Sequence, residues 1–202
     1  MEPTASAASR GISAPRHLIT VGVFTALYFV FFFAGGMLGI FHPAMMLIGG
    51  VVTVVLNGIV CMLMVAKTRA MWAYTIMGVV VGLLMVGTGH YWATVLVAAA
   101  LGVVADLITR AGGYRRATAN ALGYALFSLW GIAPILPIFL NSQAYLADIE
   151  AQMGAQYAGT FAAVFSAPVV AAWGLMTLAL AYGSALVGMR ILHRHFERAG
   201  VA

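Results

Sequence analysis

The chain has 202 residues, of which 63% are hydrophobic and 7% are charged, and its mean hydropathy is +1.02. Soluble globular domains carry roughly 25% charged residues, so this composition excludes an ordinary soluble domain and indicates a polytopic membrane protein. The net charge of +5 would suggest nucleic acid in a soluble protein, but membrane topology explains it, because Lys and Arg are retained on the cytoplasmic side.

Uncharged runs predict six membrane spans. Residues 1–17 are rich in Ala and Ser and lack an apolar period, so we expect a disordered cytoplasmic tail there. Residues 70–105 carry no charge, and one helix of that length would reach about 54 Å, against a bilayer core of about 30 Å, so the run must turn back near residues 87–90. The predicted spans cover residues 18–40, 43–66, 71–86, 91–108, 120–140 and 160–189, within a membrane domain at 18–190 that a cytoplasmic tail at 191–202 follows.

The basic residues support this count. With six spans, all ten Lys and Arg fall on one side of the membrane and both ends of the chain are cytoplasmic, whereas five or seven spans break the pattern. The sequence therefore predicts an all-α membrane protein with six transmembrane helices. Its outer side holds the loops at residues 39–43, 87–91 and 141–159.

The third outer loop has a helical pattern of its own. Tyr145, Ile149, Met153 and Tyr157 recur every four residues, with polar and acidic residues between them. This period predicts a short amphipathic helix near residues 142–157 that lies over the outer surface. A lid over a binding site and an ordinary interfacial helix are both consistent with the pattern.

Asp106 is the single acid near a predicted span. It lies close to the cytoplasmic end of the fourth span, four residues before Arg110, where an Asp–Arg pair is a common helix feature. A proton relay would need acids near the membrane centre. We therefore expect a structural role for Asp106.

Outer-side residues are the candidates for substrate binding. His42 and His90 each lie in a short turn between spans, and neutral imidazole is a common metal ligand. Met46 lies nearby and is a soft co-ligand candidate, although Met in a span is more often packing. Solvated loop histidines are the alternative interpretation.

The outer half of the fifth span is a second candidate. Pro134 and Pro137 remove backbone hydrogen bonds and predict a bend beside Trp130. Asn141 and Tyr145 follow in the outer loop, so the bent helix is a candidate pocket wall. A kink without function remains the alternative.

Small residues four apart let helices approach closely, which drives association in lipid. Gly22 and Ala26 have this spacing in the first span. They predict either internal packing or a face on which a partner docks.

Motifs of common enzymes are missing from the sequence. It has no Gly-rich phosphate loop, metalloprotease helix or nucleophile elbow, and its single cysteine excludes two-cysteine metal motifs. We expect neither a catalytic site nor a resident metal or other intrinsic cofactor.

Several motifs together resemble the Trep_Strep family of integral membrane proteins, which are regarded as substrate-binding S components of energy-coupling factor (ECF) transporters. The resemblance covers essentially the whole chain. It rests on Asp106 to Ile108, Gly112 to Arg116, Asn120 to Ala125, Phe127 to Trp130, Pro134 to Pro137 and His195 to Gly200.

This resemblance implies a protein that captures a scarce micronutrient outside the cell and docks on a membrane-embedded T subunit driven by two ATPase subunits. Gly22 and Ala26 occupy the place where such proteins present small residues to the T subunit, although the usual pattern there is Ala-Ala. The pocket would lie near the outer face, beneath the loops that hold His42, His90 and Tyr145.

A vitamin or cofactor-like molecule is the expected substrate. A metal tetrapyrrole such as haem is a second hypothesis, motivated by His42, His90 and the methionines of the outer halves. A stand-alone secondary transporter or channel is the competing class of function, and a membrane enzyme is a further one.

Overall fold

The computed structural model describes residues 14–198, with side chains described for residues 15–192. This part of the chain is helical and contains no β-strand, which confirms the predicted all-α class. In chain order the elements are α1 (Ala14–Met37), η1 (Leu38–Ile40), α2 (Pro43–Thr68), α3 (Ala73–Gly87), α4 (Thr94–Ala111), α5 (Ala117–Ser128), η2 (Leu129–Ile135), α6 (Pro137–Leu140), α7 (Ser142–Met153), α8 (Ala155–Val164) and α9 (Ala167–Arg198).

Four helical segments of the described chain are long and apolar enough to cross a membrane. They are Pro15–Ile40, Pro43–Thr68, Thr94–Ala111 and Ala167–Leu192, and α3 is a shorter apolar helix. The fifth predicted span is divided among α5, η2 and α6. A multi-pass membrane protein is therefore confirmed, with four clear candidate spans.

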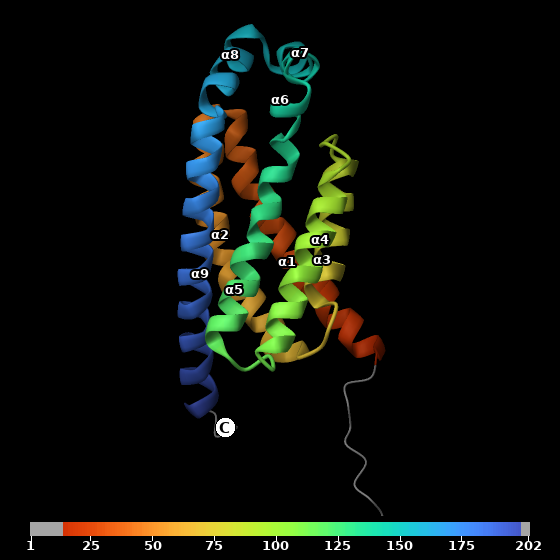
Figure 1. Cartoon of the computed structure of the whole chain (residues 1–202), viewed down its shortest axis with the longest axis vertical. Helices are drawn as coiled ribbons and strands as arrows, with labels where there is room; N and C mark the ends of the chain where they lie inside the picture. The colour runs from red at the N-terminus through yellow and green to blue at the C-terminus, as the bar shows by residue number, and fades with distance from the viewer. Residues whose placement is uncertain (1–13, 199–202) are drawn as a thin grey trace, which may run out of the picture.

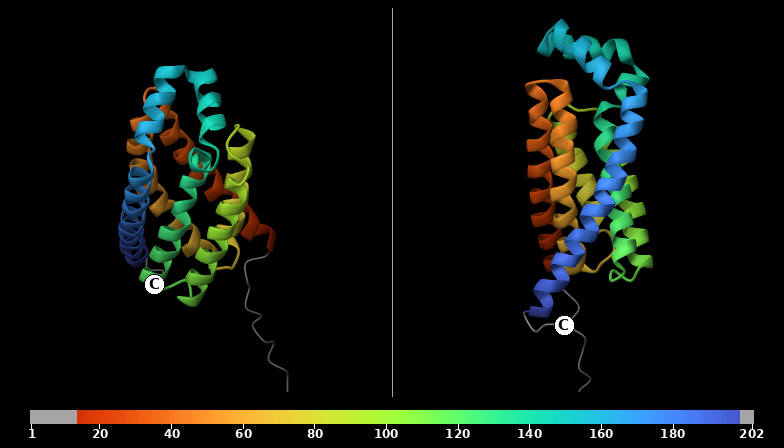
Figure 2. Two further views of the ribbon diagram at one scale, coloured as in Figure 1. Left: turned by 45° about the horizontal axis from the view of Figure 1, so that its top comes forward. Right: turned by 90° about the vertical axis from the view of Figure 1, so that its left-hand side faces the viewer.

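The long elements run side by side along the long axis of the molecule (Figure 1). α1 packs on α2, α2 on α9, α9 on α5, α5 on α4, and α4 pairs with α3 as a helical hairpin. α7 and α8 lie across one end of this bundle and cover it (Figure 2). They position the candidate site at that end.

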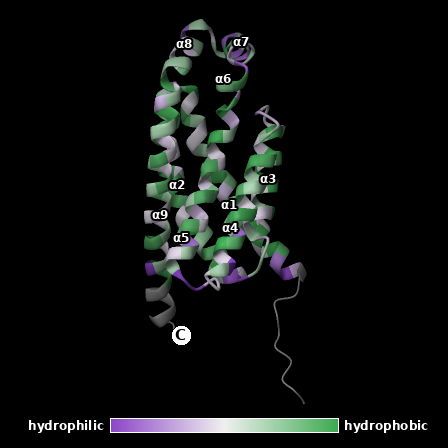
Figure 3. Cartoon of the chain, in the orientation of Figure 1, coloured by the Kyte–Doolittle hydropathy of each residue, from purple (hydrophilic) through white to green (hydrophobic). Residues whose placement is uncertain are grey.

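The two ends of the bundle differ in charge. The ends of α2 and α4 and the turn before α5 carry the basic residues Lys67, Arg69, Arg110, Arg115 and Arg116, at the end opposite α7 and α8. Hydrophilic residues collect at both ends, while the middle of the helices is apolar (Figure 3).

The predicted bend in the fifth span is confirmed. The helix tightens from α5 into the 3-10 segment η2, which contains Pro134, and Pro137 then begins α6. Proline lacks an N–H and its ring collides with the carbonyl four residues before it, so an α-helix cannot pass through these positions undistorted.

The outer segment differs from the single helix predicted near residues 142–157. It forms two helices, because Gly154 takes φ 88° between α7 and α8, a conformation that L-residues with a side chain rarely adopt. The predicted sixth span, residues 160–189, is also divided. Pro168 cannot continue a helix from Val164, so α8 ends there and α9 starts afresh at Ala167.

The chain ends extend the helices beyond the predicted spans. α1 begins at Ala14, inside the predicted tail at 1–17, and the prediction for residues 1–13 lies outside the described residues. α9 continues to Arg198, through most of the predicted tail at 191–202.

Asp106 is buried, and its side chain accepts hydrogen bonds from residues at the start of α3. Its Oδ1 accepts a hydrogen bond from the Tyr74 N–H (3.1 Å), and its Oδ2 accepts from the N–H and the hydroxyl of Thr75 (2.9 and 2.7 Å). The expected structural role is therefore observed. The expected partner was wrong, because the carboxylate faces α3 and not the exposed Arg110. A helix N-terminus offers unpaired N–H groups and a positive dipole end, which attract a buried carboxylate.

Candidate functional site

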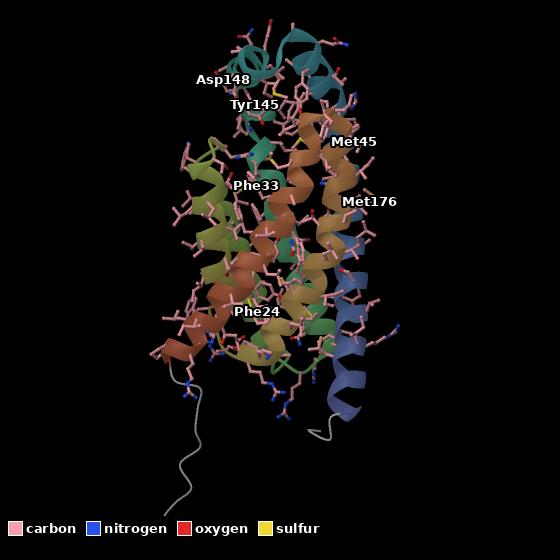
Figure 4. The ribbon with its side chains drawn as sticks, turned by 180° about the vertical axis from the view of Figure 1, so that it is seen from behind. Phe24, Phe33, Met45, Tyr145, Asp148 and Met176 are labelled. Carbon is pink, nitrogen blue, oxygen red and sulfur yellow. The ribbon has the colours of Figure 1, made fainter. Side chains whose placement is uncertain are left out.

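A cavity of about 450 Å³ lies beneath α7 and α8. α1, η1, α2, the α3–α4 turn, η2, α7 and α8 all contribute to its wall. Phe33 of α1 and Tyr145 of α7 both line it. In Figure 4 Tyr145 lies in the cover, and Phe33 lies below it on α1, in the half of the bundle nearer the cover. Ligand pockets in proteins measure about 300–1,000 Å³, so this cavity is large enough for a small organic molecule.

The wall of this outer cavity is mainly apolar and rich in sulfur. Four methionines line it: Met37, Met46, Met85 and Met153. Methionine is flexible and polarisable, so such a wall adapts to the shape of a ligand. The polar groups at the wall are few: Thr88, His90, Gln152, Tyr145 and Tyr157.

His90 is held by the end of α3. Its Nδ1 lies 3.2 Å from the Met85 carbonyl oxygen and 3.0 Å from Thr88 Oγ1. Burial lowers the pKa of His90 below its ordinary value, and the hydrogen bond to Met85 opposes this effect only partly. At neutral pH the imidazole is therefore neutral, and Nε2 is the ring nitrogen left for a ligand.

Tyr157 forms a hydrogen bond between the α7–α8 cover and the bundle. Its hydroxyl donates a hydrogen bond of 2.6 Å to the carbonyl oxygen of Gly39, in η1. Tyr145 packs edge-on against Phe161 of α8, with ring centroids 6.0 Å apart. Burial, and secondarily the nearby Tyr157, raise the pKa of Tyr145 to about 12, so its hydroxyl stays protonated.

A second, inner cavity of about 100 Å³ lies deeper between α1, α2, α5 and α9. It adjoins the outer cavity, because the same five residues line both: Phe32, Gly36, Met46, Gly131 and Ile135. Together the two form one tract that leads from the cover into the bundle.

The wall of the inner cavity is mainly apolar but includes several polar side chains. Thr53, Tyr124 and Ser128 are among the lining residues. Their hydroxyls donate to the carbonyl oxygens of Gly49 (2.7 Å), Val54 (2.6 Å) and Ala125 (2.7 Å). Two further side chains have an unpaired oxygen. Asn57 donates from Nδ2 to the Tyr28 carbonyl (3.2 Å) but its Oδ1 has no partner, and Thr177 Oγ1 has none either.

Three of the predicted substrate-binding residues line the outer cavity. They are His90, Tyr145 and Met46, and Met46 reaches the inner cavity as well. His42 lies elsewhere: it is exposed, and its Nδ1 accepts a hydrogen bond of 3.2 Å from the Ala44 N–H at the start of α2. The two histidines therefore do not share a cavity wall.

Trp130 and Asn141 also lie outside both cavity walls. Trp130 is fully buried behind them, where its Nε1 donates a hydrogen bond of 2.9 Å to the Tyr28 hydroxyl. Asn141 is exposed at the start of α7 and makes no capping hydrogen bond with its side chain.

Gly22 and Ala26, the predicted docking residues, are exposed on the outer face of α1. A methyl group added to Gly22 would meet no atom within 4 Å. This pair therefore does not pack inside the bundle.

Sequence reasoning missed Asn57 and Thr177. Both lie in the middle of apolar helices, and polar side chains at membrane depth are themselves a signal of function. That signal was present in the sequence. No group of three or more His, Cys, Asp or Glu side chains that could hold a metal ion occurs among the described residues.

Comparison with known proteins assigns the chain to a family. No curated protein and no solved structure matches the chain. A family model described as "Hypothetical bacterial integral membrane protein (Trep_Strep)" matches residues 15–198, which include every described helix of the bundle except the first residue of α1. This multi-pass protein of the cell membrane therefore belongs to the Trep_Strep family of bacterial integral membrane proteins.

Proposed function

We propose that this protein is the substrate-binding S component of an ECF-type importer. It captures a vitamin or cofactor-like micronutrient in an outward-facing pocket, and partner subunits drive uptake by hydrolysing ATP. The observation that carries the proposal is the covered, mainly apolar cavity of about 450 Å³ beneath α7 and α8. Such a cavity suits a small molecule with few polar groups.

The distribution of charge supports an outward-facing cavity. The basic turns lie at the end of the bundle opposite α7 and α8, and Lys and Arg are retained on the cytoplasmic side. With this orientation the α3–α4 turn and the α7–α8 cover face outward, and a ligand enters from outside.

The partners in this proposal are a membrane-embedded T subunit and two ATPase subunits. The exposed small residues Gly22 and Ala26 on α1 support a docking face, because they let a neighbouring helix approach closely in lipid. Replacing Gly22 with Leu would then reduce co-purification with the T subunit.

Haem is the second candidate ligand, and His90 is the observation that favours it. A metal-ligating imidazole usually donates its other N–H to a carbonyl or carboxylate. His90 Nδ1 lies 3.2 Å from the Met85 carbonyl oxygen, which leaves Nε2 for an axial bond. The Nδ1 of His42 accepts a hydrogen bond from the Ala44 N–H at the start of α2, away from the cavity. The haem hypothesis therefore depends on His90.

The first experiment is an absorption spectrum and a ligand-identifying mass spectrum of protein purified in mild detergent without added ligand. We expect one small organic molecule per chain. A strong band near the edge of the visible range that His90→Ala removes would identify haem. A protein that carries nothing, and binds nothing from a panel of vitamins and haem, would contradict a binding subunit.

Gly36→Leu tests whether the molecule occupies the tract. Gly36 lines both cavities, and a methyl group there would meet no atom within 4 Å, so the substitution adds volume beside the tract without a clash at Cβ. The matched control is Gly183→Leu, at an exposed glycine of α9 with the same open surroundings and no place in either cavity wall. Only Gly36→Leu should lose the bound molecule.

Uptake into proteoliposomes separates the competing functions. An S component binds its ligand alone but transports it only with the T subunit and ATP. Transport by the protein alone would instead establish a secondary transporter or channel, and chemical conversion of the ligand would establish an enzyme.

A further inference from the structure

The end of the bundle opposite α7 and α8 presents positive charge without an exposed negative counterpart among the described side chains, residues 15–192. Within that range, Asp148 and Glu150 lie on α7 at the other end, and Asp106 is buried against the start of α3. Figure 3 shows hydrophilic residues in several helices at this end. The exposed cations there form what we call the basic face: Arg16, Lys67, Arg69, Arg110, Arg115, Arg116 and Arg190.

The turns that carry most of these cations are braced from inside the bundle. Asp106 of α4 accepts hydrogen bonds at the start of α3 and so holds the turn between α2 and α3. Fully buried Asn120 of α5 donates from Nδ2 to the Tyr114 carbonyl oxygen (3.1 Å), which holds the turn between α4 and α5. A Cβ added at Gly112 in that turn would collide with Ala119. The cations beside these turns therefore start from fixed backbone positions.

Strained backbone gathers in the same two turns. The non-glycine residues with a positive φ in the described chain are Arg69 (44°), Trp72 (77°) and Tyr114 (59°). Such conformations are unfavourable for bulky residues, and they cluster at active sites and ligand-binding segments. Retention of Lys and Arg in the cytoplasm during insertion requires their charge, not a strained and braced backbone. The turns therefore indicate a binding role in the folded protein.

The position of the basic face selects among negatively charged partners. Its cations lie at the ends of apolar helices long enough to span the membrane, where the headgroup layer begins. They come from α1, α2, α4, α9 and both turns, so they are spread around the end of the bundle. This spread fits a planar layer of phosphates better than the surface of one protein. Trp72 is 53% exposed and fits too, because tryptophan is enriched at headgroup level.

We propose that the basic face binds the headgroups of anionic phospholipids in the leaflet on its side, which is the cytoplasmic leaflet in the orientation proposed above. The two turns form its strongest part, because they and the helix ends beside them hold five of its cations: Lys67, Arg69, Arg110, Arg115 and Arg116. This inference goes beyond the proposed uptake function and does not depend on a ligand in either cavity.

Native mass spectrometry of the detergent-solubilised full chain measures lipid binding directly. Phosphatidylglycerol and phosphatidylcholine with identical acyl chains are the probes, because only phosphatidylglycerol has a net negative charge. We expect it to bind at least about 5-fold more tightly, since each Lys or Arg near an anionic surface contributes about 5-fold in affinity. A higher concentration of ammonium acetate should reduce the difference, because salt screens exposed charges.

Arg115→Gln combined with Arg116→Gln tests the α4–α5 turn. Both side chains are exposed, and the side chain of Arg116 does not cap α5. Phosphatidylglycerol binding should weaken about 5- to 25-fold, with the lipid-free melting temperature changed by less than about 4 °C. Arg115→Lys combined with Arg116→Lys keeps the charge and should retain binding within about 2-fold.

Asp148→Asn combined with Glu150→Gln is the matched control. It removes two exposed charges at the covered end and leaves the basic face intact. Phosphatidylglycerol binding should be unchanged, whereas attraction by total charge alone would strengthen it. Lys67→Gln combined with Arg69→Gln repeats the test on the α2–α3 turn, so the inference stays testable if one glutamine pair does not fold.

Several results would overturn the inference. They are equal binding of the two lipids, phosphatidylglycerol binding that both glutamine pairs leave intact, and a loss in the lysine pair as large as in the glutamine pair. Soluble poly-glutamate that binds the basic face, with no preference between the lipids, would assign the face to an acidic protein instead. These failures leave the proposed function standing if the protein still retains a small molecule. Conversely, lipid preference without ATP-driven uptake would reject the transport role alone.

Discussion

Polar side chains near the membrane boundary of this protein mostly serve helix ends. His42 accepts from the Ala44 N–H at the start of α2, and Asp106 accepts three hydrogen bonds at the start of α3. The turn before α3 needs this support, because Trp72 takes φ 77°, which is unfavourable for a bulky residue. Asp106 thus stabilises a strained entry into the shortest of the long apolar helices.

Asp106→Ala should destabilise the protein more than any change at Arg110. It leaves the backbone N–H groups of Tyr74 and Thr75 without their carboxylate partner, at about 1–3 kcal/mol each, so the melting temperature in detergent should fall by about 4–24 °C. Arg110→Gln removes an exposed charge and should cost less than about 1 kcal/mol. Equal losses for the two variants would restore the Asp–Arg pair as the source of stability.

The sequence identified some pocket residues and missed others for a physical reason. His90, Tyr145 and Met46 follow turns whose side of the membrane the charge pattern predicts, and they line the outer cavity. Asn57 and Thr177 belong to helices whose facing sides depend on how the bundle packs. Their polarity was visible in the sequence, but their meeting at one cavity was not.

Elements that close the site are weakly attached compared with the bundle. α7 has no buried residue. It contacts the bundle through half-buried side chains such as Tyr145 and Ile149. The hydrogen bond from Tyr157 to the Gly39 carbonyl is the direct polar tie from α8 to η1. Such a segment opens more readily than a packed core helix.

Tyr157→Phe should loosen the cover without unfolding it. It removes one hydrogen bond worth about 0.5–1.5 kcal/mol, so amide exchange across residues 142–164 should become about 2- to 13-fold faster. Hydrogen-exchange mass spectrometry of the ligand-free protein measures this, and the bundle helices should be unchanged. Tyr91→Phe, in the α3–α4 turn, is the matched control. Unchanged exchange in 142–164 would show that apolar contacts alone hold the cover.

Element boundaries were predictable where a single residue type dictates the backbone. Pro134 and Pro137 predicted the break in the fifth span, and the structure has it there. The four-residue period from Tyr145 to Tyr157 concealed the break at Gly154, because hydrophobic spacing does not report a backbone φ of 88°. Glycine beyond a helix end was the available signal.

At the scale of the whole molecule, the decisive question is how often the chain crosses the membrane. The predicted fifth span is the least regular, since α5, η2 and α6 divide it into three pieces. It must cross once if α7 and α8 are to lie opposite the basic turn that contains Arg115 and Arg116. Irregular backbone at membrane depth is tolerated where it is buried in protein, and Trp130, Ala133 and Pro134 of η2 are buried.

Cysteine labelling tests this crossing on the intact protein. In a Cys61→Ala background, which removes the single, buried cysteine, Ala151→Cys in α7 and Ala111→Cys at the end of α4 place matched exposed thiols on either side of the divided span. A membrane-impermeant maleimide should label Ala151→Cys in intact cells and Ala111→Cys only after permeabilisation. Labelling of both in intact cells would mean that α5, η2 and α6 do not cross, and the reverse pattern would place the cavity on the cytoplasmic side. The reverse pattern would reject capture of a substrate from outside, because the cavity mouth would then face the cytoplasm. Labelling of both would reject the single crossing and the cytoplasmic position of the basic turns.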